Sequence, residues 1–160
     1  MRIAVLGAGS IGCLIAAKLV EAGHDVLVHA RGEHGAVLAL SGLNVSGVWD
    51  FQILPNQWTV SLDEAGIHPS LEKSFDQSII TCKAKDTEKL AEIAAQITDG
   101  PVLSLQNGLG NHEILSRYVF ENSAVGVTTN AVKRISPGQI EWVGRGSIAV
   151  GGPTGEQFIE

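Results

Sequence analysis

The stretch Gly7-Ala8-Gly9-Ser10-Ile11-Gly12 decides the fold of this 160-residue chain. It has the form G-x-G-x-x-G and stands between a strand predicted at Arg2–Leu6 and a helix predicted over residues 10–22. In that context the first glycine permits a tight turn, the second lets a pyrophosphate approach the backbone, and the third lets the helix pack closely on the strand. The motif predicts a dinucleotide site at the helix N-terminus; the alternative is three glycines in an ordinary turn.

Short apolar runs alternate with helix-period segments along the rest of the chain, which is typical of a parallel sheet covered by helices on both faces. Further strands are predicted at Asp25–Ala30 and at residues 77–82, 102–106 and 124–129, and further helices at Thr87–Ile97 and residues 111–118. The tail predicts a hairpin of strands 139–143 and 147–150, and residues 35–75 predict an irregular β segment and loop. We expect an α/β, doubly wound (Rossmann-type), mostly parallel sheet with an antiparallel C-terminal hairpin at one edge.

Composition narrows the class of protein. The formal charge is 11 minus 17, or −6, with no basic run, so we expect no nucleic-acid partner and no membrane partner. The chain lacks an apolar run of membrane-spanning length, and the segment from Met1 runs directly into a strand pattern, which favours the cytoplasm. Cys13 and Cys82 are too far apart to suggest a metal site, so we interpret them as reduced, packed thiols. The five histidines form no relay and are interpreted as structural or exposed.

The end of the second strand bears on which nicotinamide cofactor would bind. A unit that binds NAD usually carries Asp or Glu there, to accept hydrogen bonds from the ribose 2′-hydroxyl. This chain has Val28-His29-Ala30-Arg31-Gly32 instead, which places a guanidinium where it can meet a 2′-phosphate. The sequence therefore predicts NADP(H), with a solvated loop charge as the alternative for Arg31.

Polar side chains that follow the predicted strand ends carry most functional weight, because ligands of open parallel sheets bind there. Lys83 follows one strand, and at the start of a helix it opposes the helix dipole. Asn107 follows the next strand, and its amide can donate and accept at once, which suits it to orient the nicotinamide end on the substrate side. The alternatives are an exposed charge for Lys83 and a plain Asn-Gly turn for Asn107.

In this order the motifs resemble the N-terminal half of the ketopantoate reductase (2-dehydropantoate 2-reductase) family, from Met1 to about Pro153. The matching features are the glycine loop, Arg31, Lys83-Ala84, Gln106-Asn107-Gly108-Leu109-Gly110, and Thr128-Thr129 leading to Lys133-Arg134. The resemblance implies an NADP-dependent oxidoreductase of pantothenate biosynthesis that reduces a small 2-oxo acid. It also implies that Arg31 meets the 2′-phosphate and that Lys83, Asn107 and Ala131 surround the cofactor.

The family continues into a helical domain that this chain does not include. We therefore expect a dinucleotide-binding domain over residues 1–153 and the start of a linker at residues 154–160. The resemblance places the proton-donating lysine and an acidic substrate contact on that further domain, so no catalytic residue is assigned to this chain, which alone should be inactive. Two alternatives stay open: a free-standing dinucleotide sensor, and a relative that reduces another 2-oxo acid. A homodimer is also open.

Overall fold

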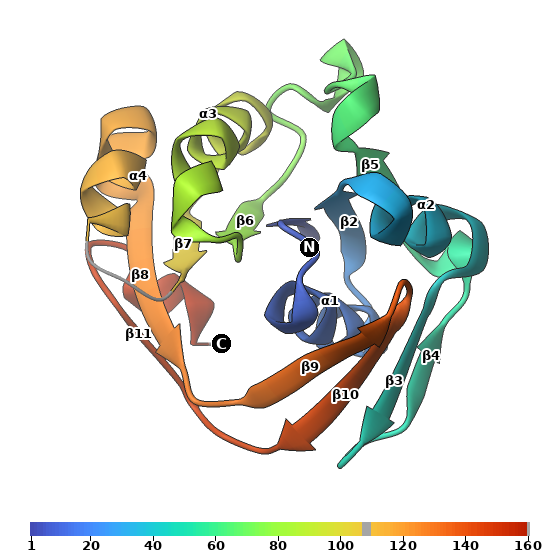
Figure 1. Ribbon diagram of the computed structural model, residues 1–160. Coiled ribbons are helices and arrows are strands. Elements are labelled where there is room, and N and C mark those ends of the chain that lie inside the picture. Colours follow the sequence, from blue (N-terminus) through green and yellow to red (C-terminus); the bar gives the residue numbers. More distant parts are fainter. Residues whose placement is uncertain (107–109, 160) are drawn as a thin grey trace.

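A seven-stranded sheet forms the centre of the protein. The computed structural model describes residues 1–106 and 110–159, and the sheet has the order β11-β8-β7-β6-β1-β2-β5 (Figure 1). Its strands are β1 (Arg2–Leu6), β2 (Asp25–Ala30), β5 (Thr59–Leu62), β6 (Gln77–Ile80), β7 (Val102–Leu105), β8 (Ser123–Thr128) and β11 (Ile148–Gly151). All neighbours pair in parallel except β8 and β11, which are antiparallel. The expected doubly wound, mostly parallel α/β fold is confirmed.

Strand β1 shows how the sequence builds the layers, because its side chains alternate between two cores. Ile3 and Val5 pack with residues of α1 (Ser10–Glu21), whereas Ala4 and Leu6 pack with residues of α3 (Thr87–Ile97) and α4 (Asn111–Val119). All four side chains are at most 1% exposed. Burial of an aliphatic side chain of this size contributes about 1.5–3 kcal/mol, so helices on both faces hold this strand in place.

A second, four-stranded sheet covers the other side of α1 (Figure 1). Its strands, in spatial order, are β4 (Phe51–Ile53), β3 (Leu43–Gly47), β10 (Gln139–Gly144) and β9 (Ala131–Ser136). Val45, Ile53 and Trp142 from this sheet share a buried core with Cys13 and Leu14 of α1. Helix α1 therefore lies between two sheets.

The predicted C-terminal hairpin is wrong in its pairing. The strand predicted at 139–143 is β10, which pairs antiparallel with β9 in the small sheet, whereas β11 pairs antiparallel with β8 at the edge of the main sheet. An antiparallel strand does cover one sheet edge, as expected, but Gly144-Arg145-Gly146 crosses between two sheets. Gly146 is packed so closely on Thr129 and Asn130 that a side chain would not fit there. The hairpin turn lies instead between β9 and β10, at Pro137-Gly138.

The stretch 35–75, expected to be irregular, is more ordered than predicted. It contains most of helix α2 (Gly32–Ser41), the strands β3 and β4, and the sheet-edge strand β5. Short 3-10 turns occur there and elsewhere, among them η4 (Ala84–Asp86) and η6 (Gly155–Phe158). In the described residues, no helix combines the length and the hydropathy needed to cross a bilayer.

Candidate functional site

A cavity of about 600 Å³ opens at the carboxyl ends of β1, β2, β5 and β6. The glycine loop forms its floor through Gly7, Ala8 and Gly9. Its basic wall residues are Arg31, Lys83, Lys85, Lys89 and Arg134, and its acidic ones are Glu33, Asp63, Glu64 and Asp86. In a parallel sheet this is the edge at which ligands bind, and the wall offers both basic and acidic side chains to a ligand.

The three glycines of the loop differ in what surrounds them. Gly7 has a φ of +106°, and a Cβ there would lie 2.9 Å from the backbone nitrogen of Cys82. A Cβ on Gly12 would overlap the carbonyl oxygen of Gly7, because α1 packs closely on the loop. A Cβ on Gly9, by contrast, would meet no described protein atom within 4 Å. Gly7 and Gly12 therefore serve the fold, and Gly9 keeps the surface above the loop free of a side chain.

The N-terminus of α1 is suited to an anion. Ser10 and Ile11 begin the helix, Gly9 is its N-cap residue, and the N–H of Cys13 donates to the Gly9 carbonyl at 2.9 Å. Gly9 has no side chain with which to cap the helix, and the first turn of α1 holds no acidic residue. The first amide N–H groups of a helix lack partners within the helix, and its dipole places a partial positive charge beside them. These residues fit a pyrophosphate.

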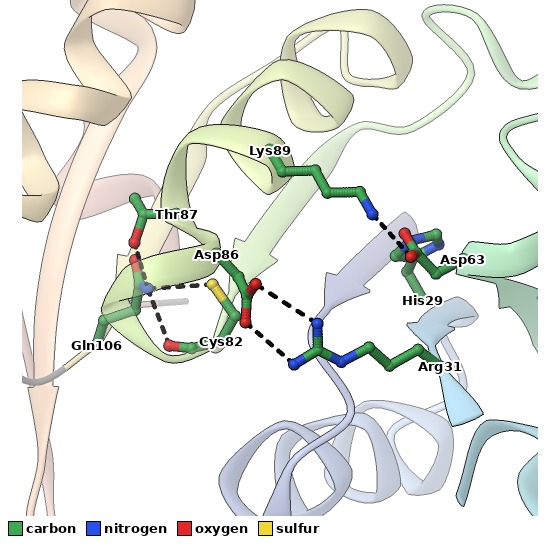
Figure 2. Close-up of polar contacts among 8 residues, drawn as sticks. All are labelled: His29, Arg31, Asp63, Cys82, Asp86, Thr87, Lys89 and Gln106. Atoms are coloured by element: carbon green, nitrogen blue, oxygen red, sulfur yellow. Dashed lines mark hydrogen bonds and ion pairs between the residues drawn. The ribbon is translucent and has the colours of Figure 1, made fainter. Parts of the chain in front are cut away.

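Arg31 stands where the sequence predicts it, directly after β2, and its guanidinium extends across the cavity (Figure 2). Nη2 of Arg31 donates to Oδ2 of Asp86 at 3.2 Å, and Nη1 lies 3.5 Å from Oδ1. Asp86 is the last residue of turn η4, which follows β6. The pair joins the wall of the cavity that follows β2 to the wall that follows β6.

A second ion pair joins the same walls (Figure 2). Nζ of Lys89, on α3, lies 2.7 Å from Oδ2 of Asp63, and Nε2 of His29 lies 3.1 Å from Oδ1 of the same carboxylate. The hydrogen bond from Lys89 is the main reason that the pKa of Asp63 is lowered from 3.8. His29 is buried and also contacts the Ser61 hydroxyl at 2.9 Å, so it has the structural role expected for it.

Gln106 fixes the turn that carries Lys83. Its side-chain amide nitrogen lies 2.9 Å from the Cys82 carbonyl oxygen and 2.9 Å from the Thr87 hydroxyl, and the Ser104 hydroxyl donates to its oxygen at 2.7 Å (Figure 2 shows the first two contacts). Gln106 is buried, so these bonds form away from water, where losing one costs most. They tie the segment after β6 to the segment after β7.

The two cysteines are free thiols and are not activated. Burial raises the pKa of Cys13 to about 12, and burial together with the Asp86 carboxylate raises the pKa of Cys82 to about 11. A thiol with so high a pKa stays protonated at neutral pH and is a poor nucleophile. In residues 1–106 and 110–159, no three His, Cys, Asp or Glu side chains are grouped to hold a metal.

The other predicted site residues are placed unequally. Lys83 lies on the cavity wall, next to the turn that Gln106 fixes. Ala131 is exposed at the start of β9 and is not among the described residues that line the cavity. Asn107 lies outside the described residues.

Sequence reasoning missed several charged wall residues, among them Asp63, Glu64, Asp86 and Lys89. Asp86 stands three positions after Lys83, just beyond the end of the same predicted strand, so its position was a usable signal. Asp63 and Glu64 follow β5, and the alternation in Thr59–Leu62 was the only sign of that strand. Its place beside β2 comes from pairing across more than thirty residues, which local patterns do not show.

Known proteins resemble this chain along almost its whole length. The family model of ketopantoate reductase PanE/ApbA matches residues 3–155. The 2-dehydropantoate 2-reductase of Archaeoglobus fulgidus is 36% identical over 150 residues, covering 94% of this chain and 47% of the relative. The chain spans about half the length of the curated relatives it matches.

Solved structures agree with this match. A PanE/ApbA family ketopantoate reductase from Ralstonia eutropha JMP134 superposes with a TM-score of 0.82 at 28% identity, over 98% of this chain and 51% of that one. D-mandelate dehydrogenase, solved with NADH and anilino(oxo)acetate, superposes with a TM-score of 0.83 at 25% identity, over 98% of this chain and 51% of that one. With its glycine loop, its cavity and this match along almost its whole length, the chain belongs to the ketopantoate reductase PanE/ApbA family.

Proposed function

We propose that this chain is the cofactor-binding half of an NADPH-dependent oxidoreductase that reduces 2-dehydropantoate to pantoate, or a closely related 2-oxo acid. One observation carries the proposal: a member of the PanE/ApbA family has Arg31, and no carboxylate, directly after β2 on the wall of a cavity floored by the glycine loop. The proposal also puts the protein in the cytoplasm, where thiols such as Cys13 and Cys82 stay reduced.

The residues present fit a nicotinamide dinucleotide. The first amide groups of α1, at Ser10 and Ile11, would hold the pyrophosphate above Gly9, and Arg31 would bind the 2′-phosphate. Lys83 would lie towards the nicotinamide end, with Asn107 on the substrate side and Ala131 nearby. When bound, the cofactor would supply hydride to the carbonyl carbon of the substrate.

The chain has a limited share in the reaction under this proposal. Its residues bind and orient the cofactor, and Gln106 holds the Lys83 turn in position. A helical domain that follows residues 154–160 would supply the lysine that protonates the substrate oxygen and an acidic substrate contact. The chain would then cover the dinucleotide-binding domain, residues 1–153, and the start of a linker.

Calorimetric titration of the 160-residue chain with NADPH and NADH tests the binding half of this proposal. We expect saturable binding of NADPH and weaker binding of NADH. With 2-dehydropantoate added, we expect negligible NADPH consumption, measured by nicotinamide absorbance, because the proton donor is elsewhere. Steady turnover by this chain alone would contradict the division of labour, and absence of NADPH binding would contradict the proposed function itself.

A reductase acting on another 2-oxo acid is the second candidate. It is favoured by the structural similarity to D-mandelate dehydrogenase, solved with NADH and anilino(oxo)acetate. Full-length protein assayed with 2-dehydropantoate and with phenylglyoxylate, the 2-oxo acid that corresponds to mandelate, separates the two. The ratio of kcat/KM for the two substrates decides between them.

A further inference from the structure

The cation expected to bind the 2′-phosphate is already paired with a carboxylate. Both terminal nitrogens of Arg31 face the carboxylate of Asp86, at 3.2 and 3.5 Å. The Asp86 side chain is 23% exposed, against 60% for Arg31, so the carboxylate is the better anchored partner. A guanidinium presents a planar fork of donors, and a carboxylate and a phosphate both use that fork.

A second carboxylate, that of Glu64, binds the backbone N–H of Gly32, the residue after Arg31. The backbone N–H of Gly32, the first residue of α2, donates to Oε1 of Glu64 at 2.7 Å. This bond is the main reason that the pKa of Glu64 is lowered. The two donors that follow β2 are therefore both held by carboxylates, one from turn η4 after β6 and one from the segment after β5.

NADPH and NADH differ only in the substituent at the 2′ position of the adenosine ribose. NADPH carries a 2′-phosphate of about −1.5 to −2 charge at neutral pH, whereas NADH carries a neutral hydroxyl. A 2′-phosphate that binds Nη1 and Nη2 of Arg31 displaces the Asp86 carboxylate from them and then lies near that carboxylate. NADH can bind with the Arg31–Asp86 pair intact, so only NADPH pays the energetic penalty of breaking it.

We propose that Asp86 is a specificity-determining residue that limits how strongly this site prefers NADPH over NADH. The inference rests on the proposed function and concerns the same site. Asp86 competes with the 2′-phosphate for Arg31, while Arg31 itself attracts the phosphate. The preference is then set by the pair and not by the arginine alone.

The size of the effect follows from the exposure of the pair. The pair is partly exposed, so solvent weakens it, and repulsion between the carboxylate and a dianionic phosphate adds to its effect on NADPH. We expect Asp86→Asn to raise the ratio of NADPH to NADH affinity by about three- to tenfold. The gain should come from tighter NADPH binding, with NADH binding nearly unchanged.

The test is calorimetric titration of the 160-residue chain with NADPH and with NADH at one ionic strength, since exposed charges are screened by salt. Asp25→Asn is the matched control: Asp25 pairs with Arg2 at 3.0 Å at the other end of β2, so the variant makes the same change in net charge. Asp86→Glu keeps the charge and should leave the ratio close to that of the parent chain. Asp86→Ser, which also removes the charge and keeps a short polar residue at the N-cap position of α3, replaces Asp86→Asn if that variant unfolds.

The outcomes separate the two proposals. A raised ratio in Asp86→Asn, absent in Asp25→Asn and Asp86→Glu, supports the inference. An unchanged ratio, or weaker NADPH binding because Asp86 positions Arg31 for the phosphate, overturns it. If the parent chain binds NADPH and Arg31→Ala weakens that binding, the proposed function stands in either case.

Discussion

The Thr81 hydroxyl donates a 2.5 Å hydrogen bond to the carbonyl oxygen of Gly7, and Gly12 packs against both partners of this bond. The end of β6, the glycine loop and the first turn of α1 thus meet at one point. A methyl group on Gly12 has no room there, because the Gly7 carbonyl is backbone and cannot turn aside.

Gly12→Ala should therefore destabilise the folded chain. Inserting a methyl group into a packed site costs about 1–3 kcal/mol, and here the loop or the helix must shift. Urea unfolding followed by circular dichroism measures the loss in the free energy of unfolding. A Gly12→Ala chain as stable as the parent would show that the loop yields more easily than the packing indicates.

Gly9→Ala is the matched change with the opposite expectation. Its φ of −70° suits alanine and its Cβ would meet no described protein atom within 4 Å, so stability should change by less than about 1 kcal/mol. The methyl group would instead lie where a pyrophosphate approaches. We expect NADPH affinity to fall at least tenfold in titration calorimetry, an effect of about 1.4 kcal/mol.

Arg31→Ala should lower NADPH affinity by about ten- to a hundredfold, the value of one charge-assisted contact, and leave NADH affinity nearly unchanged. Arg2→Ala is the control, since Arg2 forms an ion pair with Asp25 at the amino ends of β1 and β2, away from the cavity. Equal dissociation constants for the two cofactors, unaffected by Arg31→Ala, would remove the basis for an NADPH preference.

Asp63 should contribute stability that depends on pH. Because its folded pKa is lowered from 3.8, chiefly by Lys89, the contribution is present above that value and is lost as pH falls through the folded pKa. Asp63→Asn should lower the free energy of unfolding near neutral pH. It should also make that free energy fall less steeply as the pH is lowered. Urea unfolding from about pH 7 to about pH 3 measures this, and Lys89→Met should reproduce much of the flattening.

The local parts of the fold could be predicted from the sequence. The limits of Arg2–Leu6, Asp25–Ala30 and Thr87–Ile97 follow from short-range apolar patterns bounded by Gly and by the polar start of α3, and all three are confirmed. Helix α2 was missed because Gly32 and Gly35 lie in its first turns, where they weaken a helical pattern.

The non-local parts could not be predicted. The small sheet pairs β3 with β10, which are about ninety residues apart in the chain, and no local signal announces such a partner. The same limit applied to the site. Arg31 and the glycine loop were readable from position. The carboxylates that bind Arg31 and the Gly32 amide come from segments that only the tertiary structure brings near them.

The enclosure of α1 between two sheets bears on how the site responds to its cofactor. Unwinding this helix requires separating it from β1 on one side and β10 on the other, so the hydrogen-bonded amides in the middle of α1 should exchange with solvent only when the whole domain opens. The end of the cavity at α1, where we propose that the pyrophosphate binds, is therefore formed before any ligand arrives. We expect any adjustment on binding at the opposite side of the cavity, where the partly exposed Arg31–Asp86 and Lys89–Asp63 pairs lie.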